Sequence, residues 1–130
     1  MTTDRYIRMC DTPLVQEKKP TTFSWPGNIY FGMPIFELVD AKPHLFSTSD
    51  IAIVDNNAIW LPRQEDWQEM IQPISTDELM LKFYQWYHKI WFVYQMANNT
   101  YSLSITELWC AFYFHEVHGM IWNDEKGWEK

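Results

Sequence analysis

Two copies of one helix-start signal lie in the second half of this chain, and they constrain its fold more than any other feature. In each copy a serine is followed three residues later by a glutamate: Ser75 with Glu78, and Ser104 with Glu107. In such a capping box the serine oxygen accepts a hydrogen bond from the glutamate's backbone N–H, and the glutamate side chain accepts one from the serine's N–H. The sequence therefore predicts two helices that begin beside these serines.

The two predicted helices run from Thr76 to Ala97 and from Ile105 to His118. Each start is flanked by an apolar pair with the spacing of a hydrophobic staple, Ile74 with Leu79 and Leu103 with Leu108. Asn98-Asn99 tolerates turn conformations and ends the first helix. Gly119, which accepts a left-handed backbone, ends the second.

The first predicted helix changes character along its length. Its polar side chains follow helical spacing and mark a solvent-exposed face: Glu78, Lys82, Gln85 and Lys89. Beyond Lys89 the helix is apolar on all sides except at Gln95, and the second helix is apolar from Leu108 to Phe114. A helix that is apolar all round lies in a core or meets a partner, and both alternatives stay open. A membrane span is not expected, because the apolar run is shorter than about 20 residues and charges interrupt it.

The composition suits one acidic domain with a substantial core. The chain has 130 residues, 18% of them aromatic, and a net charge of -7 with 10 Lys and Arg. Aromatic rings can build a core without disulfides, and Trp and Tyr also carry much of the energy of binding surfaces. The negative charge argues against direct nucleic-acid binding, which depends on neutralising phosphates. With two cysteines and no signal segment, we expect a cytoplasmic protein.

The first half of the chain predicts mostly extended structure. Residues 1–27 are expected to form an irregular arm, in which Tyr6, Arg8 and Cys10 begin a short strand. Extended segments follow at 28–40 and 51–61, separated by a loop at 42–49. The segment 51–61 predicts a hairpin that turns at Asn56-Asn57, because asparagine tolerates the positive φ of a type I′ turn.

The remaining elements complete an α+β prediction. Pro62 precedes a short helix, Arg63–Ile71, and the last residues form a small hairpin with Gly127 at its left-handed position. We therefore expect N-terminal antiparallel β hairpins packed on a C-terminal helical pair, with a short C-terminal hairpin. The predicted organisation is a single domain, residues 1–130, with an arm at 1–27, a β-rich part at 28–62, a helical part at 63–119 and a hairpin tail at 120–130.

Two histidines and two cysteines are the candidates for chemistry. His115 and His118 share a helical face and could hold Zn²⁺ with a third ligand from His44, His88, Cys10 or an acid. Their spacing differs from the i, i+4 spacing of zincins, and histidines also favour a helix C-terminus electrostatically. Cys110 lies among aromatic residues, where a buried thiol is inert. The sequence therefore assigns no catalytic residue, cofactor or metal, and keeps His115 and His118 as weak metal candidates.

Carboxylates crowd the stretch from Asp50 to Glu78, in which Arg63 is the only basic residue. They are Asp50, Asp55, Glu65, Asp66, Glu69, Asp77 and Glu78. Such a ridge could attract a basic partner by imitating nucleic acid. The alternative is structural, because carboxylates in the first turn of a helix complement its dipole.

Two blocks in the second half of the chain are similar to a known group of proteins. They are Trp60–Met70 and a tail that contains Glu107–Phe112, Gly119, Trp122-Asn123, Glu125-Lys126 and Trp128. Together they resemble small accessory proteins of phages and prophages, chiefly of Gram-positive bacteria. The resemblance implies a phage accessory protein. Many such small acidic proteins bind host defence machinery, for example as anti-CRISPR inhibitors.

One main hypothesis and two alternatives follow. We expect a non-enzymatic, phage-encoded binding protein that inhibits or modulates a host protein in the host cytoplasm, for example a basic nucleic-acid-binding effector, and a homodimer stays open. Its expected contact residues are Glu65, Asp66, Glu69, Asp77, Trp91 and Tyr94. The first alternative sequesters a nucleotide signal, with aromatic rings on the base and Arg5, Arg8 or Arg63 on the phosphates. The second is a metal-dependent hydrolase that uses His115 and His118.

Overall fold

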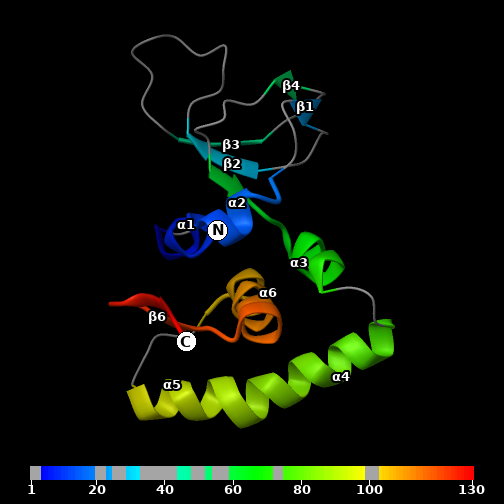
Figure 1. The fold of residues 1–130 in the computed structure, drawn as a ribbon, viewed down its shortest axis with the longest axis vertical. Coiled ribbons are helices and arrows are strands. Elements are labelled where there is room, and N and C mark those ends of the chain that lie inside the picture. Colours follow the sequence, from blue (N-terminus) through cyan, green and yellow to red (C-terminus); the bar gives the residue numbers. More distant parts are fainter. Residues whose placement is uncertain are drawn as a thin grey trace. The chain divides into compact units, whose positions relative to one another are not determined.

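The chain has an α+β fold, as the sequence predicts, in a computed structural model (Figure 1). The structure describes residues 4–19, 23–24, 29–32, 44–47, 52–53, 59–71, 75–98 and 103–130. The chain divides into two compact units, Met1–Arg63 and Gln64–Lys130. That these units form one domain, with the β-rich part packed on the helices, stays a prediction.

The N-terminal unit begins with two short helices where the sequence predicts a strand within an irregular arm. Helix α1 spans Asp4–Cys10 and helix α2 spans Pro13–Gln16. The buried residues of α1 are Tyr6, Met9 and Cys10, which follow the three- and four-residue spacing of one helix face. The predicted strand at Tyr6, Arg8 and Cys10 is therefore wrong, because its two-residue alternation leaves out Met9.

Helix α2 begins at Thr12-Pro13, inside the segment 1–27 that was expected to be an irregular arm. The Thr12 side chain accepts a hydrogen bond from the Leu14 N–H at 3.3 Å and caps the helix. Pro13 then occupies the first turn, where its missing N–H costs nothing. The Thr12-Pro13 pair is thus a helix start.

A three-stranded antiparallel sheet follows, in the order β3-β2-β5. These strands are His44–Ser47, Ile29–Gly32 and Ile59–Leu61, and a separate antiparallel pair joins β1, Phe23–Ser24, to β4, Ala52–Ile53. Two predictions are wrong. Residues 44–47 were expected to form a loop, but they form strand β3. Residues 51–61 were expected to form a hairpin, but β4 pairs with β1 and β5 pairs with β2. Both errors arise because strand partners lie far apart in the chain. The turn at Asn56-Asn57 and residues 33–40 lie outside the described residues.

The side chains of α1 and α2 hydrogen-bond to the backbone of β5 and the residue after it. The Gln16 amide donates to the Trp60 carbonyl at 3.0 Å and accepts from the Trp60 N–H at 2.9 Å. It also donates to the Cys10 carbonyl at 2.9 Å. Tyr6 donates from its hydroxyl to the Pro62 carbonyl. Because buried backbone groups must be paired, these bonds fix the two helices against the edge strand.

The C-terminal unit contains the helices that the sequence predicts. Helix α3 spans Gln64–Met70. The long helix consists of α4, Thr76–Trp86, a π-helical turn η1, Tyr87–Trp91, and α5, Phe92–Asn98. The second helix consists of α6, Ile105–Tyr113, and a π-helical turn η2, Phe114–His118. It ends at Gly119, whose φ of 66° is left-handed as predicted.

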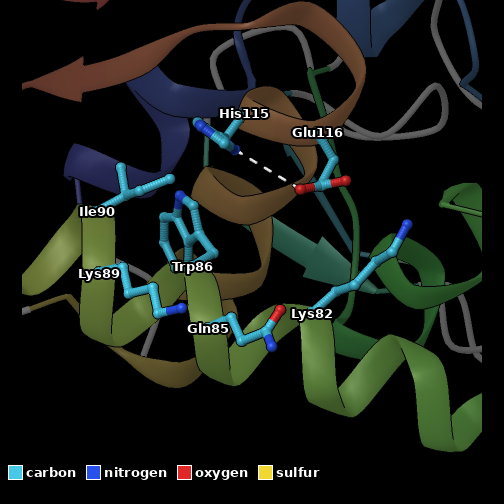
Figure 2. A pocket seen from close by; sticks show the side chains of 7 residues that line it. All are labelled: Lys82, Gln85, Trp86, Lys89, Ile90, His115 and Glu116. Atoms are coloured by element: carbon cyan, nitrogen blue, oxygen red, sulfur yellow. Dashed lines mark ion pairs between the residues drawn. The ribbon is translucent and has the colours of Figure 1, made fainter.

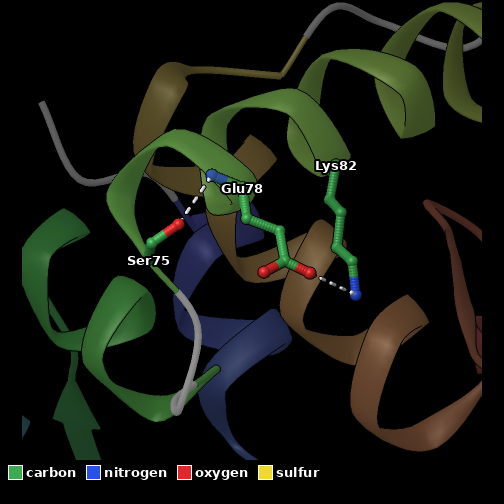
Figure 3. A network of polar contacts seen from close by, with 3 residues as sticks. All are labelled: Ser75, Glu78 and Lys82. Atoms are coloured by element: carbon green, nitrogen blue, oxygen red, sulfur yellow. Dashed lines mark hydrogen bonds and ion pairs between the residues drawn. The ribbon is translucent and has the colours of Figure 1, made fainter.

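The two capping boxes form to different degrees. Ser104 Oγ accepts from the Glu107 N–H at 3.2 Å, and Glu107 Oε1 accepts from the Ser104 N–H at 2.8 Å, so this box is complete. Ser75 Oγ likewise accepts from the Glu78 N–H at 3.2 Å, but the Glu78 carboxylate lies 3.9 Å from Lys82 Nζ (Figure 3). The difference follows burial. Glu107 is 3% exposed and held in place, whereas Glu78 is exposed and turns toward Lys82.

Aromatic rings join the three helical segments of this unit. Phe83 of the long helix stacks on Trp109 of α6 with ring centroids 4.0 Å apart, and it meets Phe112 edge-on at 5.4 Å. Trp67 of α3 packs on Tyr113 of α6 at 5.1 Å. Helix α6 therefore supplies the rings on which both other helices pack.

The chain ends in the predicted hairpin. Strand β6, Ile121–Asn123, pairs with β7, Gly127–Glu129, and places Trp122 opposite Trp128. Gly127 has a φ of 80°, the left-handed value expected of it. Trp128 stacks on Phe114 with ring centroids 3.8 Å apart, so the hairpin is held on the second helix.

We expect Ser104→Ala to lower the free energy of unfolding by about 1 kcal/mol, because it removes one partner of the complete box. Ser75→Ala should cost less, because the reciprocal bond of that box is replaced by an exposed ion pair. Urea unfolding of both variants measures the difference. Equal losses would contradict the role assigned to Glu107.

Candidate functional site

The long helix leaves a row of large apolar side chains in solvent. They are between 47% and 71% exposed: Met80, Leu81, Tyr84, Phe92, Val93 and Met96. We call this set the apolar face. Met80 and Tyr84 are four residues apart, as are Phe92 and Met96, so each pair lies on one side of the helix. Exposed His88 lies between the two halves, with its ring 4.4 Å from that of Tyr84.

The buried side of the same helix packs within its own unit. Its buried residues are Leu79, Trp86 and Trp91. Trp86 and Trp91 are five residues apart. Residues with this spacing lie on different sides of an α-helix, but they lie on the same side where a π turn separates them. The turn η1 thus brings their rings to 6.0 Å in a stacked arrangement. As a result the buried side stays continuous, and the apolar face remains in solvent on the other side.

Exposure of the apolar face to water costs free energy, and a partner that buried the face would remove this cost. Burying a large apolar side chain is worth about 1.5–3 kcal/mol relative to leaving it in water. The face extends from Met80 to Met96, about 25 Å along the helix axis at 1.5 Å per residue. Contiguous apolar patches on monomers commonly mark binding sites, whereas scattered apolar residues need no explanation. The concentration of six exposed, large apolar side chains on one helix therefore makes this row the candidate site.

Acidic side chains border one end of the apolar face. A pocket of about 260 Å³ is lined by residues of α3 and of the first turns of α4: Glu65, Gln68, Glu69, Thr76, Leu79 and Met80. Met80 belongs to the apolar face, so the acidic side of α3 and the apolar face meet in this pocket. Asp77, which is also exposed, lies in the first turn of α4. The site is therefore apolar along the helix and negative at its N-terminal end.

The expected contact residues fall into two groups. Glu65, Glu69 and Asp77 are exposed, and Asp66 is half-buried. Asp50 and Asp55 lie outside the described residues. Glu65, Asp66 and Asp77 also occupy first turns of helices, where they complement the helix dipole, so their position serves stability as well as the surface.

The two aromatic residues expected to contact a partner face the interior of the unit. Trp91 is 1% exposed, so its predicted contact role is wrong: the π turn points it into the core. Tyr94 is half-buried, and its hydroxyl accepts from Asn123 Nδ2 at 3.2 Å. On the long helix, the exposed Tyr and Phe rings among the described residues are Tyr84 and Phe92, which were not among the expected contact residues. The four-residue spacing along the face was the available signal.

The histidine and cysteine candidates lie in packed surroundings. His115 Nδ1 is 3.7 Å from the Glu116 carboxylate, and the His118 ring packs against those of Tyr113 and Phe114, each at 5.5 Å. Within the described residues, no group of three or more His, Cys, Asp or Glu is placed to hold a metal ion. Cys10 and Cys110 are both buried and are not joined in a disulfide, and the burial of Cys110 is as predicted.

The arginines named for a nucleotide ligand all lie in the N-terminal unit. Arg5 and Arg8 belong to α1, and Arg63 follows β5. Arg8 is exposed, whereas Arg5 and Arg63 are half-buried. All three already interact with other groups of the chain, so the nucleotide hypothesis gains no support from them.

We expect Trp91→Ala to lower the free energy of unfolding by about 3–5 kcal/mol, because it opens a cavity in the core. Met96→Ala should change it by less than about 0.5 kcal/mol, because Met96 is exposed. Chemical denaturation of the two variants measures this contrast. A small effect of Trp91→Ala would show that Trp91 is not a core residue.

Comparison of the chain with protein-family models, curated proteins and solved structures finds no match. Among the described helices, none combines the length and the apolar character needed to cross a membrane. The apolar face and the acidic residues at its N-terminal end are therefore the features from which a function can be inferred.

Proposed function

We propose that this chain is a non-enzymatic binding protein that docks on a partner protein through the apolar face of its long helix. One observation carries the proposal: the apolar face stays in solvent while the other side of the same helix is packed in the core. A helix that needed only one buried side would carry polar residues on the other. Here large apolar side chains occupy much of that other side.

The acidic border indicates the chemistry of the partner. Glu65 and Glu69 share a pocket with Met80, and Asp77 is exposed one helical turn before Leu81. A matching surface would present an apolar strip flanked by Lys or Arg. The net charge of -7 would speed the approach of such a surface. We therefore assign most of the binding energy to the apolar face. The acidic residues steer the partner during association and orient it on the face.

A second copy of the chain fits this site less well than a basic partner. Two-fold pairing would place the same residues on both sides of the contact. Among the described residues, neither the apolar face nor the pocket of Glu65 and Glu69 includes a Lys or Arg, so a dimer through this face offers the acids no opposite charge. We therefore place a different protein on this surface.

The resemblance to phage accessory proteins extends the proposal to a biological setting. In that setting the partner is a host protein, and the chain inhibits or modulates it in the host cytoplasm. A nucleic-acid-binding defence protein has the basic surface that the acidic border requires. Its activity would be altered by occlusion of that surface, which requires no catalytic group from this chain.

A photo-crosslinking amino acid in place of Phe92 should capture one protein from a lysate of a Gram-positive host. We expect the captured peptide to contain apolar residues next to Lys or Arg. Met96→Glu, introduced in the same chain, should abolish capture without lowering the unfolding midpoint, because Met96 is exposed. The matched control carries the crosslinker in place of exposed Lys126 in the hairpin turn.

Capture at Lys126 equal to that at Phe92 would argue against a specific site. Crosslinking of the chain to a second copy of itself would contradict the proposal that a different protein binds the apolar face. Sedimentation of the purified chain would then show a dimer. A captured peptide rich in Asp and Glu would contradict the role of the acidic border.

Charge reversal at the border should act on the rate of association. We expect Glu69→Lys to slow binding to the captured partner several-fold at low salt, and the effect to fade as salt is raised, because exposed charges are screened. Glu125→Lys in the exposed hairpin turn makes the same charge change away from the site. Equal effects of the two variants would show that only net charge matters, and no effect of Glu69→Lys would remove the acids from the interface.

A further inference from the structure

A second concave site lies on the polar side of the long helix. Its volume is about 310 Å³, and it lies between the long helix and the turn η2 (Figure 2). The helix contributes Lys82, Gln85, Trp86, Lys89 and Ile90, and η2 contributes His115 and Glu116. These residues take no part in the apolar face, so the site is a separate feature of the same helix.

The lining is positive in an otherwise acidic chain. The chain has 10 Lys and Arg and 17 Asp and Glu, and two of the lysines, Lys82 and Lys89, line this site. The lining includes one carboxylate, that of Glu116, which lies 3.7 Å from His115 Nδ1. Lys82 Nζ is also 3.9 Å from Glu78, but both side chains are about half exposed, and such pairs are weak. The two ammonium groups therefore remain able to bind an anion.

Two buried polar atoms of the lining have no hydrogen-bond partner among the residues that the structure describes. They are Trp86 Nε1 and His115 Nδ1. Trp86 is 3% exposed, and its indole N–H can only donate. Leaving such a donor unpaired costs about 1–3 kcal/mol, so an acceptor at this position would stabilise the fold. Figure 2 shows the nitrogen edge of Trp86 turned toward His115, within the group of residues that lines the site.

We propose that this pocket binds a small oxyanion, a metabolite that carries a phosphate or carboxylate group. The ammonium groups of Lys82 and Lys89 neutralise its charge, and the indole N–H of Trp86 donates to one of its oxygens. Lysine suits this task as a compact point charge. Ile90 and the indole ring supply apolar contact for the remainder of the ligand. The volume lies at the lower end of the range for ligand pockets, which favours a small metabolite over a dinucleotide.

The test uses the whole chain, labelled with ¹⁵N, and three probes at equal ionic strength: pyrophosphate, succinate and chloride. The readout is the indole N–H signal of Trp86, identified by its loss in Trp86→Phe, which keeps a ring but removes the donor. We expect pyrophosphate or succinate to move this signal saturably at millimolar concentration, whereas chloride does not. The more effective probe identifies phosphate or carboxylate as the ligand group.

Charge variants test the proposal even if the Trp86→Phe variant fails to fold. Lys82→Gln and Lys89→Gln should each weaken binding by about tenfold, the loss of roughly 1.4 kcal/mol. Lys126→Gln is the matched control, because it removes the same charge from the exposed hairpin turn. The proposal is wrong if neither pyrophosphate nor succinate moves the Trp86 signal saturably. It is also wrong if Lys126→Gln weakens binding as much as Lys82→Gln and Lys89→Gln do. None of these outcomes bears on docking through the apolar face.

Discussion

The stack of Phe83 on Trp109 is the contact on which the C-terminal unit depends. Its ring centroids are 4.0 Å apart, and it joins the long helix to α6. Trp67 and the C-terminal hairpin pack on the same second helix through Tyr113 and Phe114. Because α6 and η2 together hold three neighbours, the stretch Leu108–Phe114 is apolar on all sides, whereas the long helix buries only one side.

The π-helical turns set which side chains of each helix reach the core. In η1 the extra residue of the turn aligns Trp91 with Trp86, so the buried side stays continuous across the turn. The same rotation directs Phe92 and Met96 to solvent. π turns are rare and occur frequently at functional sites. Here one turn adjoins both the exposed apolar face and the pocket lined by Lys82 and Lys89.

The long helix thus presents two surfaces of opposite character. Large apolar side chains with acids at one end suit a basic protein surface, whereas the polar side forms a small pocket with two lysines. The same α6 and η2 rings support both, because they hold the helix in place without covering either surface. Both proposed binding surfaces therefore lie on the same helix.

The sequence by itself determined the elements whose signals are local. Capping serines, Gly119 and Gly127 fixed helix starts, a helix end and a hairpin, because a hydrogen bond or a left-handed φ depends on only a few neighbouring residues. Only the tertiary structure decided the strand partners and the exposure of each ring. Trp91 and Phe92 are adjacent and both apolar, yet one is buried and the other exposed. The choice depends on the π turn and on the rings of α6, and neither can be read from the local sequence.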